Sequence, residues 1–125
     1  MSEMMKAIVQ HSFGGPEVLQ YEDTPLPRLK AGEMLVRVHA IGLNPPDWYL
    51  REGYKMLPAE WQPQVSFPVV LGTDVSGVVV AVSDNVDEFV VGDEVYAMVR
   101  FPDGLAGESR AYAEYVSVPV SQVAL

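Results

Sequence analysis

The sequence predicts a mainly β domain, a compact and partly open β-barrel with one short helix. Short runs rich in β-branched residues recur along the chain, and clusters of Gly, Pro, Asn and Asp separate them at intervals typical of all-β domains. Only one segment carries both the start and the stop signals of a helix. The 125 residues have the size of one domain, so residues 1–125 are assigned to a single domain.

The first part of the chain predicts three strands. Lys6–Gln10 and Val18–Glu22 form an opening hairpin, because Gly14-Gly15-Pro16 between them combines glycines that tolerate positive φ with a proline of fixed φ. Met34–Ala40 alternates between two faces, which indicates a half-buried strand. One face of this strand carries Met34, Val36, Val38 and Ala40, and the other carries Arg37 and His39.

The second part predicts three more strands. Asp74–Ser83 is so rich in valine that it is either buried on both faces or strongly bent at Gly77. Val95–Val99 and Ala111–Val118 are the other two, and Pro119 marks the end of the last. Turns are expected at Ser83-Asp84-Asn85, Val91-Gly92-Asp93-Glu94 and Pro102-Asp103-Gly104.

The helix candidate follows the Met34–Ala40 strand. Asn44 can cap it, Pro45 can occupy its first turn and Gly53 can end it, with Asp47–Glu52 as its body. Leu57–Pro68 contains three prolines and is expected to be an irregular loop.

Composition excludes several classes of function. The net charge of −9 disfavours nucleic acids and anionic membrane surfaces as partners. The chain has no cysteine, so it offers no disulfide, thiolate nucleophile or cysteine-based zinc site, and cytoplasmic residence is the simplest expectation. No signal peptide is visible, and no apolar stretch is long enough to insert into a membrane as a helix.

The motifs of self-contained active sites are missing. HExxH, GxSxG, CxxC and GxGxxG do not occur. Gly72 to Gly77 has the glycine spacing of a phosphate loop, but Val78 stands where the essential lysine belongs. His11 and His39 are the only histidines, and neither has other ligands at metal-binding spacing, so His39 is interpreted as a solvated surface residue.

The densest group of functional side chains runs from Asn44 to Tyr54, directly after a predicted strand. An asparagine amide and phenols can orient a carbonyl or carboxamide, and Trp48, Tyr49 and Tyr54 can wall a flat ring. A structural explanation stays open: Asn44 as a cap, Asp47 as a first-turn charge and the aromatic rings as packing.

Several motifs in a fixed order span essentially the whole chain. They are Lys6-Ala7-Ile8-Val9, Phe13 to Leu19, Val36 to Gly42 leading into Asn44-Pro45-Pro46-Asp47, Arg51, Gly53, Pro68, Gly72-Thr73-Asp74, Gly77, Val91 to Val95 and Ala111 to Val116. This series resembles medium-chain dehydrogenase/reductases of the zinc-independent quinone oxidoreductase type, within the alcohol dehydrogenase superfamily.

The resemblance implies a GroES-like catalytic domain that abuts a nucleotide-binding Rossmann domain, with the nicotinamide ring in the cleft between them. Asn44 and Thr73 stand where zinc-dependent relatives have a cysteine and a histidine ligand, which implies that no zinc is bound. Asn44 and Tyr49 match residues near the nicotinamide and the substrate carbonyl, and Tyr54 is a further wall candidate. Two glycine positions of the family depart here, at Ser83-Asp84-Asn85 and at Arg110.

The resemblance also implies a reaction for the parent enzyme, hydride transfer from NADPH to a quinone or an α,β-unsaturated carbonyl. The chain lacks the Rossmann domain, so alone it is expected to bind no cofactor and to be inactive. An alternative is a non-enzymatic GroES-like module for assembly or for binding a small apolar ligand. The acceptor, the choice between NADPH and NADH, and the oligomeric state, for which a homodimer is one option, stay open.

Overall fold

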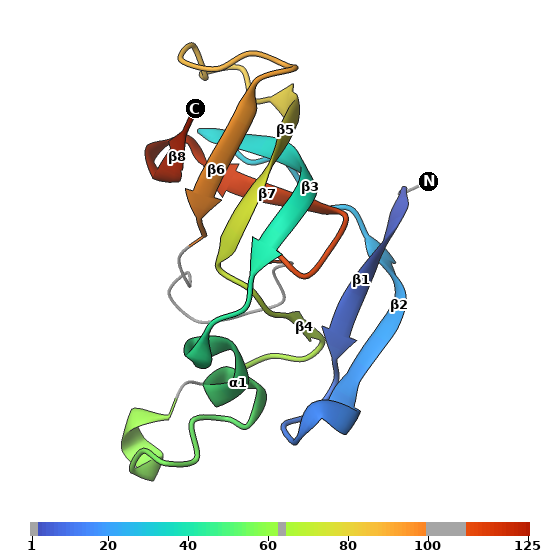
Figure 1. Cartoon of the computed structure of the whole chain (residues 1–125), viewed down its shortest axis with the longest axis vertical. Helices are drawn as coiled ribbons and strands as arrows, with labels where there is room; N and C mark the ends of the chain where they lie inside the picture. The colour runs from blue at the N-terminus through green and yellow to red at the C-terminus, as the bar shows by residue number, and fades with distance from the viewer. Residues whose placement is uncertain (1–2, 63–64, 100–109) are drawn as a thin grey trace.

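The computed structural model describes residues 3–62, 65–99 and 110–125, and its strands form two sheets (Figure 1). One sheet has the strand order β2-β1-β4 and the other β7-β3-β5-β6-β8. The strands are β1 (Met4–Gln10), β2 (Leu19–Pro25), β3 (Glu33–Gly42), β4 (Val69–Val70), β5 (Asp74–Val82), β6 (Glu94–Met98), β7 (Tyr115–Pro119) and β8 (Val123–Ala124). The predicted mainly β, partly open barrel is confirmed.

The helical content of the described residues is small. It consists of the α-helix α1 (Pro45–Arg51) and the 3-10 helices η1 (Pro16–Val18), η2 (Ala59–Trp61) and η3 (Val120–Gln122). The segment predicted as an irregular loop therefore contains one short helical turn, η2. No helix in the described part of the chain has the length and apolar character needed to span a membrane.

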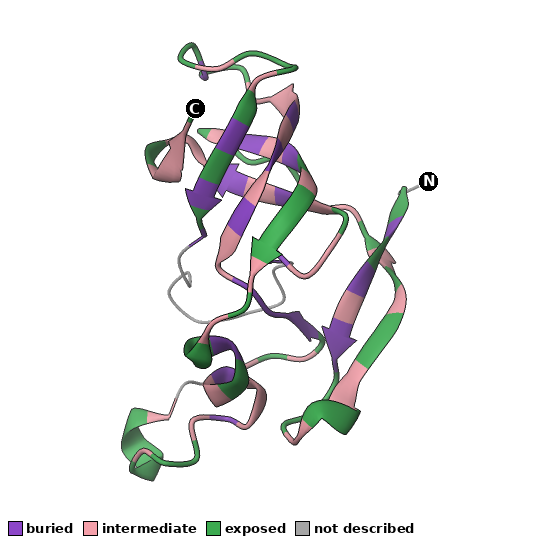
Figure 2. Cartoon of the chain, viewed as in Figure 1, coloured by how far each residue is buried: buried purple, intermediate pink, exposed green. Residues whose placement is uncertain are grey.

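The main hydrophobic core lies on the inner face of the five-stranded sheet. Alternate residues of β3, β5, β6 and β7 are buried there, as the colour change along β6 in Figure 2 shows. Branched residues suit this pleated surface, because it fixes their single preferred rotamer at little entropic cost. The core consists of Met34, Val36, Val75, Val79, Val86, Val95, Ala97, Val99, Ala111, Val116 and Val118.

The alternation in β3 stops at a bulge. Met34 and Val36 are buried as predicted, but the pairing of β3 with β5 shifts register between Val38 and Ala40, and Ala40 is exposed. A bulge puts one extra residue into a strand, so the side chains beyond it change faces. Placing Ala40 on the same face as Met34 was therefore wrong.

The valine-rich β5 is buried on one face only, so the first of the two alternatives given for it, burial on both faces, is wrong. Val75, Gly77 and Val79 are buried, whereas the residues between them are half-buried. Gly77 allows the closest approach of β3, since a Cβ at this position would lie within van der Waals overlap of the Arg37 carbonyl oxygen. The glycine thus serves strand pairing.

The opening hairpin is confirmed, with β1 and β2 paired from Met4 opposite Pro25 to Gln10 opposite Leu19. The turn at its tip is attached to α1. The Gly14 backbone N–H donates to the Arg51 carbonyl oxygen at 3.0 Å, and Arg51 Nε donates to the Gly14 carbonyl oxygen at 3.0 Å. Two motifs that are far apart in the sequence therefore meet in the fold.

The strand predicted at Ala111–Val118 is shorter, because β7 begins only at Tyr115. The four residues before it, Ala111 to Glu114, bridge the two sheets instead. Ile8 of β1 donates its backbone N–H to the Tyr112 carbonyl oxygen at 2.8 Å, and Val38 of β3 donates to the Glu114 carbonyl oxygen at 2.8 Å. This bridging segment satisfies backbone groups of both sheets at once.

Two of the three predicted turns lie in the described residues and are confirmed. Asp84 and Asn85 form one, and Val91 and Gly92 form the other, with Gly92 at φ 101°. The third, Pro102-Asp103-Gly104, lies outside the described residues. Arg110, one of the two departures from the family pattern, is 2% exposed.

Candidate functional site

The predicted helix forms directly after β3 and brings the candidate side chains together. Asn44 precedes it in extended conformation, with φ −129° and ψ 154°, and Pro45 begins its first turn. At the other end Gly53 and Tyr54 both have positive φ, 84° and 53°. A tyrosine in the left-handed region is unusual, and such backbone conformations concentrate at functional sites.

Asn44 is held by two carboxylates. Its backbone N–H donates to Asp47 Oδ2 at 3.0 Å, which is the contact that an acidic third residue makes in a capping box. Its side-chain Nδ2 donates to Asp74 Oδ2 at 2.8 Å. Gly42 makes room for this second contact, because a Cβ there would lie 3.0 Å from the Asp74 side chain. Asn44 is therefore a cap and, in addition, an oriented amide.

Asp47 is more than a first-turn charge. It is 4% exposed, and its Oδ2 also accepts a hydrogen bond from the Tyr112 hydroxyl at 2.8 Å. Its other oxygen, Oδ1, is buried without a hydrogen-bond partner among the described residues. Burial raises the pKa of Tyr112 well above its ordinary value of 10.0, and the hydrogen bond to Asp47 raises it further. The Tyr112 hydroxyl therefore stays a donor over the neutral pH range.

A cavity of about 430 Å³ lies beside this network. Leu19, Leu43, Trp48 and Leu71 give it apolar walls, and Asn44, Asp47, Arg51 and Tyr112 bring polar groups to it. Small-molecule sites commonly combine apolar walls with a few placed polar groups. This cavity has the composition to take a flat, mostly apolar ring that carries an oxygen.

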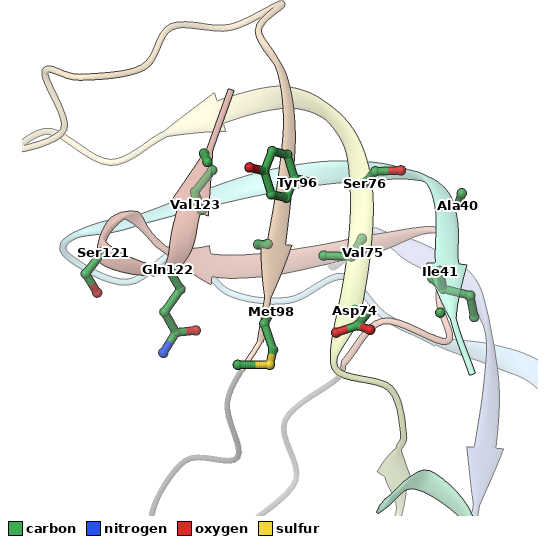
Figure 3. Close-up of a pocket in the computed structure, with 13 residues that line it drawn as sticks. Ala40, Ile41, Asp74, Val75, Ser76, Tyr96, Met98, Ser121, Gln122 and Val123 are labelled. Atoms are coloured by element: carbon green, nitrogen blue, oxygen red, sulfur yellow. The ribbon is translucent and has the colours of Figure 1, made fainter. Parts of the chain in front are cut away.

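A larger cavity of about 770 Å³ lies over the outer face of β5 and β6 (Figure 3). Figure 3 shows Asp74 and Met98 at one end of it, where β5 begins and β6 ends. Asp74 lines this cavity and Asn44 lines the smaller one, so their hydrogen bond connects the two linings.

The two candidate tyrosines lie on the helix and just after it. The Tyr49 ring contacts Trp48, with centroids 4.3 Å apart, and Tyr54, with centroids 6.0 Å apart. Burial, followed by the charge of Asp47, raises the pKa of Tyr54. Of these three aromatic residues, Trp48 lines the smaller cavity, and neither tyrosine belongs to its lining within the described residues.

No group of three or more His, Asp or Glu side chains that could hold a metal ion occurs among the residues that the structure describes. His39 is exposed, as predicted. His11 is also exposed and its Nε2 lies 2.6 Å from Glu22 Oε1. Thr73 uses its backbone oxygen to accept from the Val99 N–H at 2.6 Å.

Asp74 and Tyr112 belong to the candidate site, and sequence reasoning missed them. Both belong to motifs that were recognised for their order only, and no spacing rule connects them to the helix. Tyr112 is 65 positions from Asp47, and Asp74 is 30 positions from Asn44. The only sequence signal for them is their place at the beginning of predicted strands, Asp74–Ser83 for Asp74 and Ala111–Val118 for Tyr112.

Comparison with known proteins identifies the family. Residues 30–125 match the family described as the alcohol dehydrogenase GroES-like domain. The chain belongs to this family. The quinone oxidoreductase of Sus scrofa is 37% identical to this GroES-like domain over 115 residues, which are 90% of the chain and 31% of the relative.

Solved structures agree with this assignment. The quinone oxidoreductase of Coxiella burnetii matches 98% of the GroES-like domain with a TM-score of 0.81 and 36% identity. The Escherichia coli quinone oxidoreductase complexed with NADPH matches 96% of it with a TM-score of 0.79 and 29% identity. The chain spans 37% and 32% of these two proteins, about a third of their length. The resemblance to the quinone oxidoreductase type of medium-chain dehydrogenase/reductases is confirmed.

Proposed function

We propose that the chain is the substrate-side domain of an NADPH-dependent oxidoreductase that transfers a hydride to a quinone or an α,β-unsaturated carbonyl without zinc. The observation that carries the proposal is the Asn44 amide, fixed by Asp74 next to a cavity with apolar walls. The similarity to quinone oxidoreductases, one of them solved with NADPH, supports the reaction class.

The described residues around Asn44 fit a ring and not the cofactor's phosphates. Arg51 is the one basic side chain in the described linings of the two cavities, and it already donates to Gly14 and pairs with Glu52 at 3.1 Å. We therefore assign the phosphates to another domain and the nicotinamide end to the surroundings of Asn44, with Tyr49 and Tyr54 as outer walls. The absence of zinc is supported by chemistry, because the neutral side chains of Asn44 and Thr73 are not usual zinc ligands.

NADPH, when bound, supplies the hydride. A quinone that takes up a hydride and one proton becomes a hydroquinone, and an α,β-unsaturated ketone becomes a saturated ketone. The chain's residues contribute position: Asn44 orients a polar atom of the reactants, and the leucines and Trp48 exclude water from the ring. Positioning of this kind lowers the barrier without a metal ion.

Two measurements test the proposal. The ¹⁵N-labelled chain is titrated with 1,4-naphthoquinone. This quinone cannot add to a thiol of the chain, because the chain has no cysteine. Shifts are expected at Asn44, Leu43 and Trp48, and NADPH oxidation by the isolated chain is expected to be undetectable. The complete product of the gene should oxidise NADPH only when the quinone is present. A complete product without quinone-dependent oxidation, or robust turnover by the isolated chain, contradicts the proposal.

The Tyr49 assignment has its own test in the complete product. Tyr49→Phe removes only the hydroxyl, so the ring contacts with Trp48 and Tyr54 remain. If Tyr49 orients the acceptor, kcat/KM for the quinone falls by about tenfold, the effect of losing one hydrogen bond of ordinary strength. Unchanged acceptor kinetics remove Tyr49 from the site. Tyr115→Phe, at a tyrosine of β7 that is absent from the described linings of both cavities, is the matched substitution for effects of a lost phenol alone.

A further inference from the structure

We propose that Tyr112 is a positioning residue of the acceptor site, which fixes Asn44 through the Asp47 carboxylate. This inference rests on the proposed function and adds a residue from a distant part of the chain to its site. The contacts form a relay with a shared acceptor: the Tyr112 hydroxyl and the Asn44 backbone N–H both donate to Asp47 Oδ2, at 2.8 and 3.0 Å.

The Tyr112 ring is itself held in place from several sides. Its backbone N–H donates to the Leu71 carbonyl oxygen at 2.9 Å, and its carbonyl oxygen accepts from Ile8 at 2.8 Å. Gly72, with φ 108°, leaves the space that the ring occupies, because a Cβ there would lie 2.7 Å from Tyr112 Cδ1. A donor fixed by two separate segments, β1 and Leu71-Gly72, delivers its hydrogen bond without losing further side-chain entropy.

Asp47 depends on that donor. The carboxylate is buried and its Oδ1 has no hydrogen-bond partner among the described residues, so its stabilising contacts there are the two donors on Oδ2. A buried carboxylate that loses a donor moves toward solvent or rearranges, because burial without hydrogen bonds is costly. Either movement releases the Asn44 backbone, while the Asp74 contact alone remains on its side chain.

The test uses the ¹⁵N-labelled chain and needs no turnover. Tyr112→Phe keeps the ring against Gly72 and removes the hydroxyl. The backbone amide of Asn44 is expected to exchange with solvent about tenfold faster, and its side-chain NH₂ resonances to shift. Tyr115→Phe is the control, since Tyr115 lies on β7 and is absent from the described linings of both cavities. Asn44 resonances that stay unchanged in a folded Tyr112→Phe chain overturn the proposal.

Asp47→Asn provides a second variant that does not touch the packing of Tyr112. It keeps the size of the side chain and removes the charge that both donors share, so Asn44 should respond as in Tyr112→Phe. If Tyr112→Phe does not fold, Asp47→Asn alone decides: an unmoved Asn44 in this variant contradicts the relay.

Kinetics of the complete gene product separate positioning from simple stability. Tyr112→Phe is expected to lower kcat with 1,4-naphthoquinone by about tenfold while the KM for NADPH stays the same. The reason is that, under the proposed function, this chain contacts only the nicotinamide end of NADPH. Tyr115→Phe should leave both values unchanged. A fall in kcat that comes with an equal rise in the KM for NADPH overturns the positioning role, and so does an unchanged kcat. If the wild-type product shows no turnover, the proposed function fails while the exchange measurement still tests the relay.

Discussion

The five-stranded sheet and the region around α1 are stabilised by different kinds of interaction. The sheet encloses a continuous core of eleven buried residues, most of them valines. Around α1 the buried apolar residues are few, Leu50 and Leu71 with partly buried neighbours, and charged or polar contacts from Asn44, Asp47 and Tyr112 make up the rest. Apolar packing stabilises the sheet, whereas hydrogen bonds set the orientation of side chains in the α1 region.

This difference bears on the candidate site. Apolar packing tolerates exchange between hydrophobic side chains of similar volume, whereas a hydrogen bond fixes one atom relative to another. The Asn44 amide is placed by the second kind of contact, at the point where β3 ends and α1 begins. Substitutions in the two regions should therefore differ in size and in what they change.

The largest difference is expected from cavity-forming substitutions. Met34→Ala removes a side chain that is 0% exposed between paired strands that cannot close the gap, so the free energy of unfolding should fall by about 3–5 kcal/mol. Leu50→Ala, in the small cluster, should cost about 2–3 kcal/mol, because its neighbour Leu71 borders a cavity that can relax. Urea denaturation measures both. Equal costs, or the reverse order, would show that the two regions are packed alike.

The next effect concerns strand pairing in the larger sheet. Gly77→Ala forces a Cβ against the Arg37 carbonyl oxygen, and since backbone cannot yield as a side chain does, we expect a loss of about 3 kcal/mol. Gly32→Ala is the matched control, as no atom lies within 4 Å of its Cβ position and only its φ of 78° opposes the substitution. Its cost should be about 1 kcal/mol. A thermal melt in which both variants lose the same stability argues against the close approach.

The smallest effect is a pH dependence that belongs to the α1 region. The pKa of Tyr112 is raised in the folded chain, by burial first and by the Asp47 hydrogen bond second. Above the ordinary tyrosine value the unfolded chain loses this proton while the folded chain keeps it, so stability falls as the pH rises beyond about 10. Tyr112→Phe should lose less stability than the wild type between about pH 9 and 11. Parallel profiles for the two chains would rule out this linkage.

Most of the larger sheet could be predicted from the sequence, because its strands carry local signals. Alternation predicted the buried Met34 and Val36, and Gly92 marked its turn. The same rule failed at Ala40, since a bulge depends on how β3 pairs with β5 and leaves no mark on β3 alone. It also failed at Ala111 to Glu114. These residues have the composition of a strand, but they bridge the two sheets and do not belong to β7.

The candidate site was predictable in part. The capping signals of Asn44 and Pro45 fixed the helix, because capping is a local interaction of neighbouring residues. Asp74 and Tyr112 could not be assigned, since their contacts join segments that are far apart in the sequence and meet only in the folded domain. The roles of Tyr49 and Tyr54 stay predictions from the family resemblance.

The bridging segment at Ala111 to Glu114 also limits how this domain can move. Its backbone is hydrogen-bonded to β1 and to β3, so a hinge motion between the two sheets would have to break its bonds to one of them. The domain is thus expected to travel as one body during any opening or closing of a cleft. Under the proposed function, acceptors of different size would then be accommodated by the loop after α1 and by surface side chains such as Trp48 and Leu43, which are 44% and 76% exposed.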